Sequence, residues 1–116
     1  MHEEWKINLY RDPRGKSPVK EFIDGVEVKA QTKVRNAINL LKEFGVMTGS
    51  PHIKKLKGTE LWELRILGTD SIRIFYVTMT GRIFLLLHGF KKKKDKTPQK
   101  EIKIALERLS ERRSRL

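Results

Sequence analysis

The sequence predicts a single α+β domain over residues 1–116: an N-terminal strand, a two-helix hairpin, a three-stranded antiparallel meander and a C-terminal helix. The chain has 116 residues, 38% of them hydrophobic, which suffices for one core and not for two. Residues 61–67, 71–78 and 82–90 are rich in β-branched and aromatic side chains, and glycine-containing turns separate them. Apolar residues before and after this meander recur with helical spacing instead.

The N-terminal third predicts one strand and two helices. Apolar and polar residues alternate over 5–10, as in a half-buried strand. Ser17 stands before a proline, which predicts a helix start with the serine hydroxyl accepting a hydrogen bond from the first turn. Gly25 ends this helix, a second one runs over about 27–44, and Gly45 stops it. The two helices form a hairpin that we expect to lie on the apolar face of the sheet.

The segments flanking the meander are a loop and a helix. Residues 46–53 contain glycine and proline and predict a loop. Thr97 and Pro98 repeat the signature of a capping residue followed by proline, and they predict the start of the last helix. Its end, 111–116, is expected to fray. The apolar stripe of this helix consists of Ile102, Ala105, Leu106 and Leu109.

The turns of the meander predict its register. A loop over 68–70 makes one face of the first two strands apolar, and this face belongs to the core. Arg65 then lies opposite Arg73 on the other face. A two-residue turn at 80–81 places His88 beside Arg73, which extends the basic row onto the third strand. The apolar pairs are Ile66 with Ile72, Leu64 with Ile74, and Trp62 with Tyr76.

Two arginines paired across a sheet need a physical cause, because like charges directly opposite each other cost about 0.2–1 kcal/mol. One cause is an anionic ligand, since two guanidinium groups can hold one phosphate through several charge-assisted hydrogen bonds. The alternative is that Glu63 neutralises both arginines from the diagonal position.

The net charge of +12 and a pI near 10.2 predict a polyanionic partner, either nucleic acid or an acidic protein. Residues 91–116 contribute eleven Lys or Arg against four Asp or Glu, a net charge of +7. A membrane partner is not expected, because no run of about 18 apolar residues is present and the N-terminus lacks the features of a signal peptide. The absence of cysteine is compatible with a cytoplasmic location.

The residues with chemical potential are mostly basic. The three histidines stand apart and no carboxylates cluster, so neither a metal site nor a cofactor is predicted. RNA cleavage suits such a set, because RNA carries its own nucleophile and needs cations, a base and an acid. Arg65 and Arg73 are candidates for the cations, and His88 or a lysine for moving protons. For His88, the alternative is a partly buried polar residue at a strand end.

Lysines on both sides of the meander predict an electrostatic groove for RNA. The groove would be lined by Lys54, Lys55, Lys57 and the run Lys91, Lys92, Lys93 and Lys94; the alternative is a solvated charge cluster. Phe90 either stacks on a base or caps the core. Trp62 and Tyr76 are assigned to the core.

The order of elements, with LKGTELWELRI, IRIFYV and LLLHGFKKKKDKTPQKEIKIA, resembles the HigB branch (phage Gp49-like) of the RelE/ParE toxin superfamily over about residues 5–110. The resemblance implies a type II toxin, a metal-independent, ribosome-dependent mRNA endonuclease (mRNA interferase) acting on mRNA in the ribosomal A site. A helix-turn-helix, HigA-like antitoxin would neutralise it, and operator DNA would be contacted only through the antitoxin complex.

By analogy with RelE-like toxins, the resemblance implies active residues at Arg65, Arg73, and Lys91 or Lys92. RelE uses a tyrosine near the start of the last segment. The segment KDKTPQ offers none, which moves the proton-transfer role to His88 or a lysine such as Lys92.

Two alternatives in other functional classes remain open. A ParE-like toxin would inhibit DNA gyrase and cleave nothing. A non-catalytic basic module would bind nucleic acid or a protein partner and be harmless when expressed alone.

Overall fold

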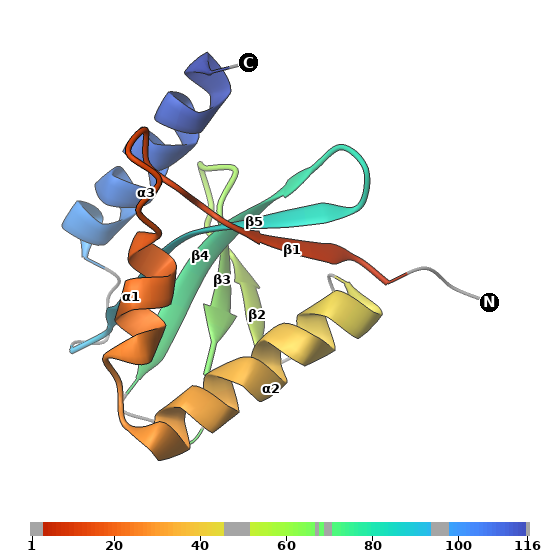
Figure 1. Ribbon diagram of the computed structural model, residues 1–116, viewed down its shortest axis with the longest axis vertical. Coiled ribbons are helices and arrows are strands. Elements are labelled where there is room, and N and C mark those ends of the chain that lie inside the picture. The colour runs from red at the N-terminus through yellow and green to blue at the C-terminus, as the bar shows by residue number, and fades with distance from the viewer. Residues whose placement is uncertain (1–3, 46–51, 67, 69–70, 94–97, 116) are drawn as a thin grey trace.

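The computed structural model describes residues 4–45, 52–66, 68, 71–93 and 98–115. Five strands form one sheet in the order β1-β5-β4-β3-β2, in which β1 runs parallel to β5 and the other neighbours are antiparallel (Figure 1). The α+β class is therefore confirmed. The elements are β1 (Lys6–Leu9), α1 (Pro18–Asp24), α2 (Val28–Phe44), β2 (Ile53–Lys55), β3 (Trp62–Arg65), β4 (Ile72–Met79), β5 (Ile83–Lys91) and α3 (Gln99–Ser114).

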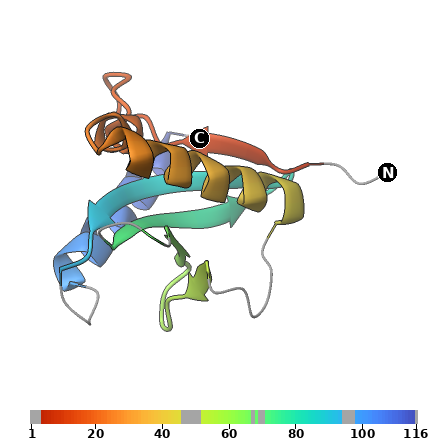
Figure 2. The ribbon, with the colours of Figure 1, turned by 90° about the horizontal axis from the view of Figure 1, so that it is seen from below.

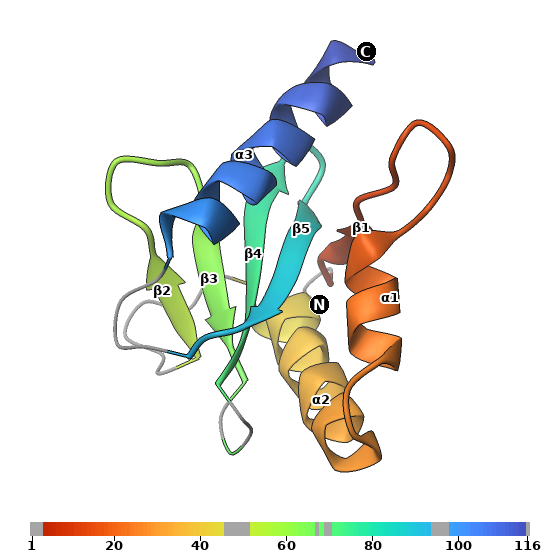
Figure 3. The same cartoon turned by 90° about the vertical axis from the view of Figure 1, so that its left-hand side faces the viewer.

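The sheet separates two hydrophobic clusters. Helices α1 and α2 cover one face, as the hairpin prediction expected, and α3 crosses the other (Figures 2 and 3). The first cluster joins Val34 and Leu41 of α2 to the sheet residues Ile74, Tyr76 and Phe84. The second packs Ala105 and Leu109 of α3 against Leu61, Phe75, Leu85 and Leu87. Because both faces are covered, the central strands β4 and β5 are nearly continuously buried.

Glycines end α1 and α2 as predicted. Gly25 follows α1, and Gly45 follows α2 with φ +68°. A Cβ at Gly45 would lie 2.8 Å from Nε1 of Trp5, so the site requires glycine for space as well as for backbone conformation. Helix α1 begins directly after Ser17 with Pro18 in its first turn, as predicted, but the expected hydrogen bond is wrong, because the Ser17 hydroxyl makes no capping contact. Thr97 lies outside the described residues.

Two details of the sequence prediction differ from the structure. Strand β2 was not predicted: Ile53 was expected at the end of the loop over 46–53, but it begins β2, which pairs with β3. A strand of three residues is too short to show alternation in the sequence. The end of α3 was expected to fray but continues to Ser114, because Glu111 accepts a hydrogen bond from the Tyr10 hydroxyl at 2.6 Å.

The predicted register holds between β3 and β4 and changes between β4 and β5. Arg65 pairs with Arg73, as expected. However, Met79 pairs with Ile83 across a three-residue turn, and a bulge follows at Phe75/Tyr76. The two one-residue shifts add up, so that Arg73 pairs with Phe90 and not with His88. The prediction that His88 lies beside Arg73 is wrong; it keeps the same face but lies opposite Phe75.

Candidate nucleic-acid interface

The two paired arginines share one buried carboxylate. Glu63 is fully buried in β3, and its Oε1 lies 3.2 Å from Nε of Arg65 and 3.6 Å from Nε of Arg73. The side chains of Arg65 and Arg73 remain 32% and 16% exposed. The alternative in which Glu63 neutralises both arginines is therefore correct in part. Two guanidinium groups against one carboxylate leave one positive charge at the surface.

The register selects which lysines accompany the arginines. Lys54 pairs with Glu63 and therefore lies on the arginine face, whereas Lys55 pairs with Trp62 and lies on the opposite face. The backbone N–H of Lys92 donates to the Ser71 carbonyl at 2.9 Å, which extends the β4–β5 pairing by one residue.

By strand alternation, Lys92 lies on the face of Arg73 and Lys91 on the other. Lys91 lines a hollow of about 260 Å³ together with Lys29 and Lys33 of α2, which agrees with this assignment. Of the two positions that the family resemblance left open, this alternation assigns Lys92 to the arginine face. Lys57 and Lys93 are exposed in the segments after β2 and β5. Lys94 lies outside the described residues.

His88 is bound on both ring nitrogens by α3. Its Nε2 lies 2.7 Å from Oε1 of Glu101, and its Nδ1 lies 3.1 Å from Nη1 of Arg108. A guanidinium can only donate, so Nδ1 accepts and Nε2–H donates to Glu101, which describes a neutral imidazole. Burial lowers the pKa of His88, the positive charge of Arg108 lowers it further, and the hydrogen bond to Glu101 opposes both. The structure leaves neither nitrogen free for substrate, and His88 instead ties α3 to β5.

Phe90 belongs to the core. It is 5% exposed and packs between Phe75, at 4.9 Å between ring centroids, and His88, at 5.5 Å. This burial leaves no ring face for a base, so the stacking interpretation is wrong and the core interpretation is correct. The core assignments of Trp62 and Tyr76 are confirmed, since Tyr76 is fully buried and Trp62 packs against the same cluster. Burial also raises the pKa of Tyr76.

The partners of His88 were missed in the sequence, although a signal for them exists. Glu101 and Arg108 are seven residues apart in α3, about two helical turns, and so lie on the same side of the helix. Arg108 also donates to the Leu87 carbonyl at 2.9 Å, which adds a second attachment to β5.

A protein-family model describing phage-derived Gp49-like proteins (DUF891) matches residues 21–110. The chain belongs to the Gp49-like family. This confirms the resemblance seen in the sequence, because the Gp49-like proteins form the HigB-like toxin family of the RelE superfamily. Membership indicates the toxin of a toxin–antitoxin pair, with an antitoxin as partner.

A search of curated proteins found no match to this Gp49-like chain. Within the described ranges, none of the helices has both the length and the apolar character needed to cross a bilayer.

Proposed function

We propose that this Gp49-like protein is a type II toxin that cleaves mRNA in the ribosomal A site and thereby stops translation in the cytoplasm. The observation that carries the proposal is the Arg65–Arg73 pair, which adjoins Lys54 and Lys92 on one face of the sheet. The element order, with two helices on one face of the sheet and one helix on the other, supports placement in the RelE/ParE superfamily. The excess positive charge of this face suits a phosphate of the RNA backbone.

The proposed reaction uses the RNA itself as nucleophile. The ribose 2′-hydroxyl gives its proton to a solvent water molecule as its oxygen attacks the neighbouring phosphorus, the bond to the 5′-oxygen breaks, and a 2′,3′-cyclic phosphate and a 5′-hydroxyl result. Arg65 and Arg73 hold the phosphate and stabilise the charge that develops on its oxygens. Lys92 donates a proton to the departing 5′-oxygen, since an ammonium group on the same face can act as a general acid.

The other basic residues of this face hold the RNA and the ribosome. Lys54 extends the arginine face toward the sheet edge at β2. Lys57 and Lys93 are exposed and contribute contacts to the phosphate backbone. A HigA-like antitoxin neutralises the protein, and operator DNA is bound only through that complex.

The test is cell-free translation of a defined mRNA with the purified protein, with cuts mapped by primer extension in the presence and absence of ribosomes. We expect cuts only with ribosomes. Arg73→Lys keeps the positive charge but removes the two-pronged guanidinium geometry, so cutting should fall by about 100-fold or more. Circular dichroism must show that the variant is folded. Intact mRNA with unimpaired translation would contradict the proposal and direct attention to DNA gyrase.

A matched pair of lysine variants tests the assignment of the proton donor. Lys91→Gln and Lys92→Gln remove the same charge from adjacent positions that lie on opposite faces of the sheet. We expect Lys92→Gln to slow cleavage at least tenfold and Lys91→Gln to change it less than threefold. Equal effects of the two variants would show that only the total charge matters and would remove Lys92 from the reaction.

A further inference from the structure

The two edges of β1 are used differently by the fold. β1 lies at the margin of the sheet, so only one of its edges is paired with another strand (Figure 2). The backbone N–H groups of Lys6 and Tyr10 donate to carbonyls in and next to β5, at 2.8 and 2.9 Å. Alternate residues of a strand point their N–H and C=O groups to the same side. The backbone groups of Ile7 and Leu9 therefore point outward, away from the sheet.

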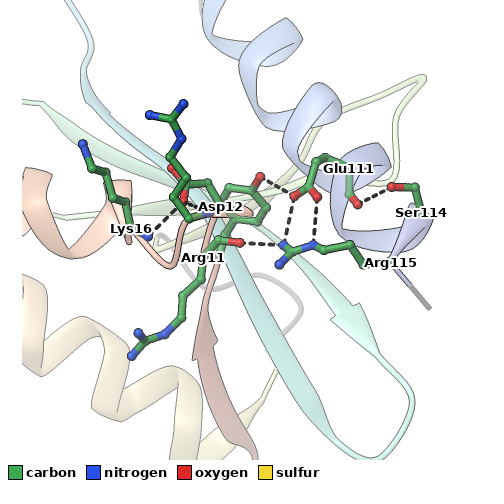
Figure 4. A network of polar contacts seen from close by, with 8 residues as sticks. Arg11, Asp12, Lys16, Glu111, Ser114 and Arg115 are labelled. Atoms are coloured by element: carbon green, nitrogen blue, oxygen red, sulfur yellow. Dashed lines mark hydrogen bonds and ion pairs between the residues drawn. The ribbon is translucent and has the colours of Figure 1, made fainter.

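The ends of this outward row are occupied, but its middle is not. The Trp5 N–H donates to a carbonyl near the end of α2 at 2.9 Å. At the other end, the Arg11 carbonyl accepts from the Arg115 side chain (Figure 4). Between them, Ile7 and Leu9 make no outward hydrogen bond within the part of the chain that the structure describes. Their N–H and C=O groups are thus open to another strand.

A hollow of about 610 Å³ follows the same edge. Residues 7–11 all line it, together with the start of α1 and the end of α3. Side chains alternate between the two faces along a strand. A hollow that touches every residue of this stretch therefore lies along the edge of β1 and not over one face. It has the position that a further strand would take, between the two helices.

The two faces beside this edge differ in chemistry. Ile7 and Leu9 are half-buried and pack against the cluster under α1 and α2. Lys6 and Asn8 alternate with them and are exposed. They lie on the face of α3, because Asn8 pairs with Leu85 of the cluster under that helix. One side of the edge is therefore apolar, and the other is polar.

Cations gather on the α3 side of the edge. Arg112 and Arg115 at the end of α3 line the hollow. Glu111 pairs with Arg115 at 2.8 Å, whereas none of the ion pairs found between described residues involves Lys6 or Arg112. A segment placed along this edge meets positive charge on its α3 side, which favours acidic side chains there.

We propose that the outer edge of β1 binds an extended acidic segment of a partner protein as a sixth strand of the sheet. The backbone of this segment pairs with Ile7 and Leu9. Its apolar side chains lie on the side of α1 and α2, and its acidic side chains alternate with them on the side of α3. Backbone pairing supplies the affinity, and the alternation supplies the specificity.

Two other occupants fit this edge less well. RNA could contact the cations but has no row of amide groups that matches the open groups of a strand. A second copy of this chain would bring Lys6 and Arg112 of both copies to one edge, and the net charge of +12 on each copy opposes this. Strands β5 and β4 separate β1 from the strand of Arg65, so strand addition does not depend on RNA cleavage.

The first test compares two peptides of equal composition. Fluorescence anisotropy with the full-length protein measures the dissociation constant of a labelled seven-residue peptide in which glutamate and valine alternate. The second peptide has its valines grouped at one end, so it has the same charge but cannot place them all on one side of a strand. We expect the grouped peptide to bind at least tenfold more weakly. Equal affinities would mean non-specific attraction and would overturn the proposal.

Methylated forms of the alternating peptide test the backbone pairing. In an added strand, the amides of the valines and those of the glutamates point to opposite sides, and only one set faces β1. N-methylation of that set removes its hydrogen-bond donors and should weaken binding at least tenfold. N-methylation of the other set should change it less than threefold. Equal effects of the two modifications would contradict strand addition.

A matched pair of variants removes one outward donor of β1. Leu9→Pro removes the outward N–H and leaves the bonds to β5 in place, since proline is tolerated on the solvent side of an edge strand. Leu9→Ala shortens the same side chain but keeps the N–H. We expect Leu9→Pro to bind the alternating peptide at least fivefold more weakly than Leu9→Ala, and equal binding by two folded variants would refute the pairing. If thermal unfolding shows that Leu9→Pro is not folded, the methylated peptides decide.

A second pair of variants tests the charge. Arg112→Gln and Arg113→Gln remove the same charge from adjacent positions, of which only Arg112 lines the hollow. We expect Arg112→Gln to weaken binding of the alternating peptide at least threefold and Arg113→Gln less than twofold. Equal losses would show that only the total charge matters and would overturn the proposed placement of the acidic side chains.

Two further outcomes would assign the edge to another occupant. Displacement of the labelled peptide by oligouridylate at the same concentration as by the unlabelled peptide would make RNA the ligand. A dimer of the protein alone in sedimentation velocity, lost in Leu9→Pro but kept in Leu9→Ala, would make a second copy the occupant. We expect a monomer and no displacement by oligouridylate at that concentration.

Discussion

Two regions of this protein set arginines against a carboxylate in different ways. In the Arg65–Arg73 cluster a fully buried Glu63 holds both guanidinium groups against the sheet. Between β1 and the end of α3, Glu111 accepts from Tyr10 and pairs with Arg115, and its side chain stays 29% exposed. The comparison teaches that the burial of the carboxylate, and not the number of cations around it, decides how much an ion pair contributes to stability.

The largest effect should come from removing the buried carboxylate. Glu63→Gln leaves two adjacent guanidinium groups without their shared anion and should destabilise the fold by about 3 kcal/mol. This is the lower end of the range for a broken buried ion pair, because both arginines keep contact with water. Urea unfolding measures the loss, with exposed Glu107→Gln as a control expected to change stability by less than about 0.5 kcal/mol. An unchanged midpoint for Glu63→Gln would show that Glu63 does not fix the arginines.

A smaller effect should follow from releasing Glu111. Tyr10→Phe removes one hydrogen bond of 2.6 Å to a partly exposed carboxylate and should cost about 1 kcal/mol. Hydrogen exchange should show faster opening of the last turn of α3, with the first turn unaffected. Uniform exchange along α3 would mean that the helix end is held by other contacts.

The attachment of α3 through His88 should depend on pH. Burial lowers the pKa of His88 in the folded protein, so the neutral ring is favoured there. Its contribution to stability is then fully present above the unfolded pKa of about 6.5 and is lost as pH falls through the folded pKa. The effect is limited because Glu101 opposes the shift. Thermal unfolding at pH 7.5 and pH 5 should show a larger drop for wild type than for His88→Gln, and equal drops would exclude His88 as the cause.

The smallest effect is expected at the surface pair of Arg113 and Glu60. The groups are in contact at 2.7 Å, but both side chains are about half exposed. A double-mutant cycle with Arg113→Gln and Glu60→Gln should give a coupling of about 0.5 kcal/mol or less, reduced further by salt. A coupling comparable to the Glu63 effect would undermine the distinction between buried and exposed ion pairs.

The sequence placed the Arg65–Arg73 pair correctly but not its neighbours on β5. Arg65 and Arg73 could be paired because both strands alternate and their apolar faces must coincide. His88 was misplaced because its position depended on the length of the turn after Met79 and on a bulge, neither of which alternation reveals. Phe90 was ambiguous for the same reason, since its neighbours on β4 were not known.

The sequence patterns did not identify the residues that α3 contacts on the sheet. Its apolar stripe predicted that it packs on the sheet, but not where along the sheet its polar residues would meet partners. The Tyr10–Glu111 hydrogen bond joins residues 101 positions apart. A charged helix end that was expected to fray is therefore attached to the rest of the fold.

The sequence by itself determined every element except β2, together with the hairpin, the paired arginines, the excess of positive charge and the family. These are local or periodic properties, because turn residues, helical spacing and strand alternation act over a few residues. Only the tertiary structure decided that Glu63 is buried under the arginines, that Lys92 and not Lys91 joins them, and that α3 occupies both nitrogens of His88. Each of these depends on contacts between segments far apart in the chain, where a shift of one residue changes the neighbour of every side chain.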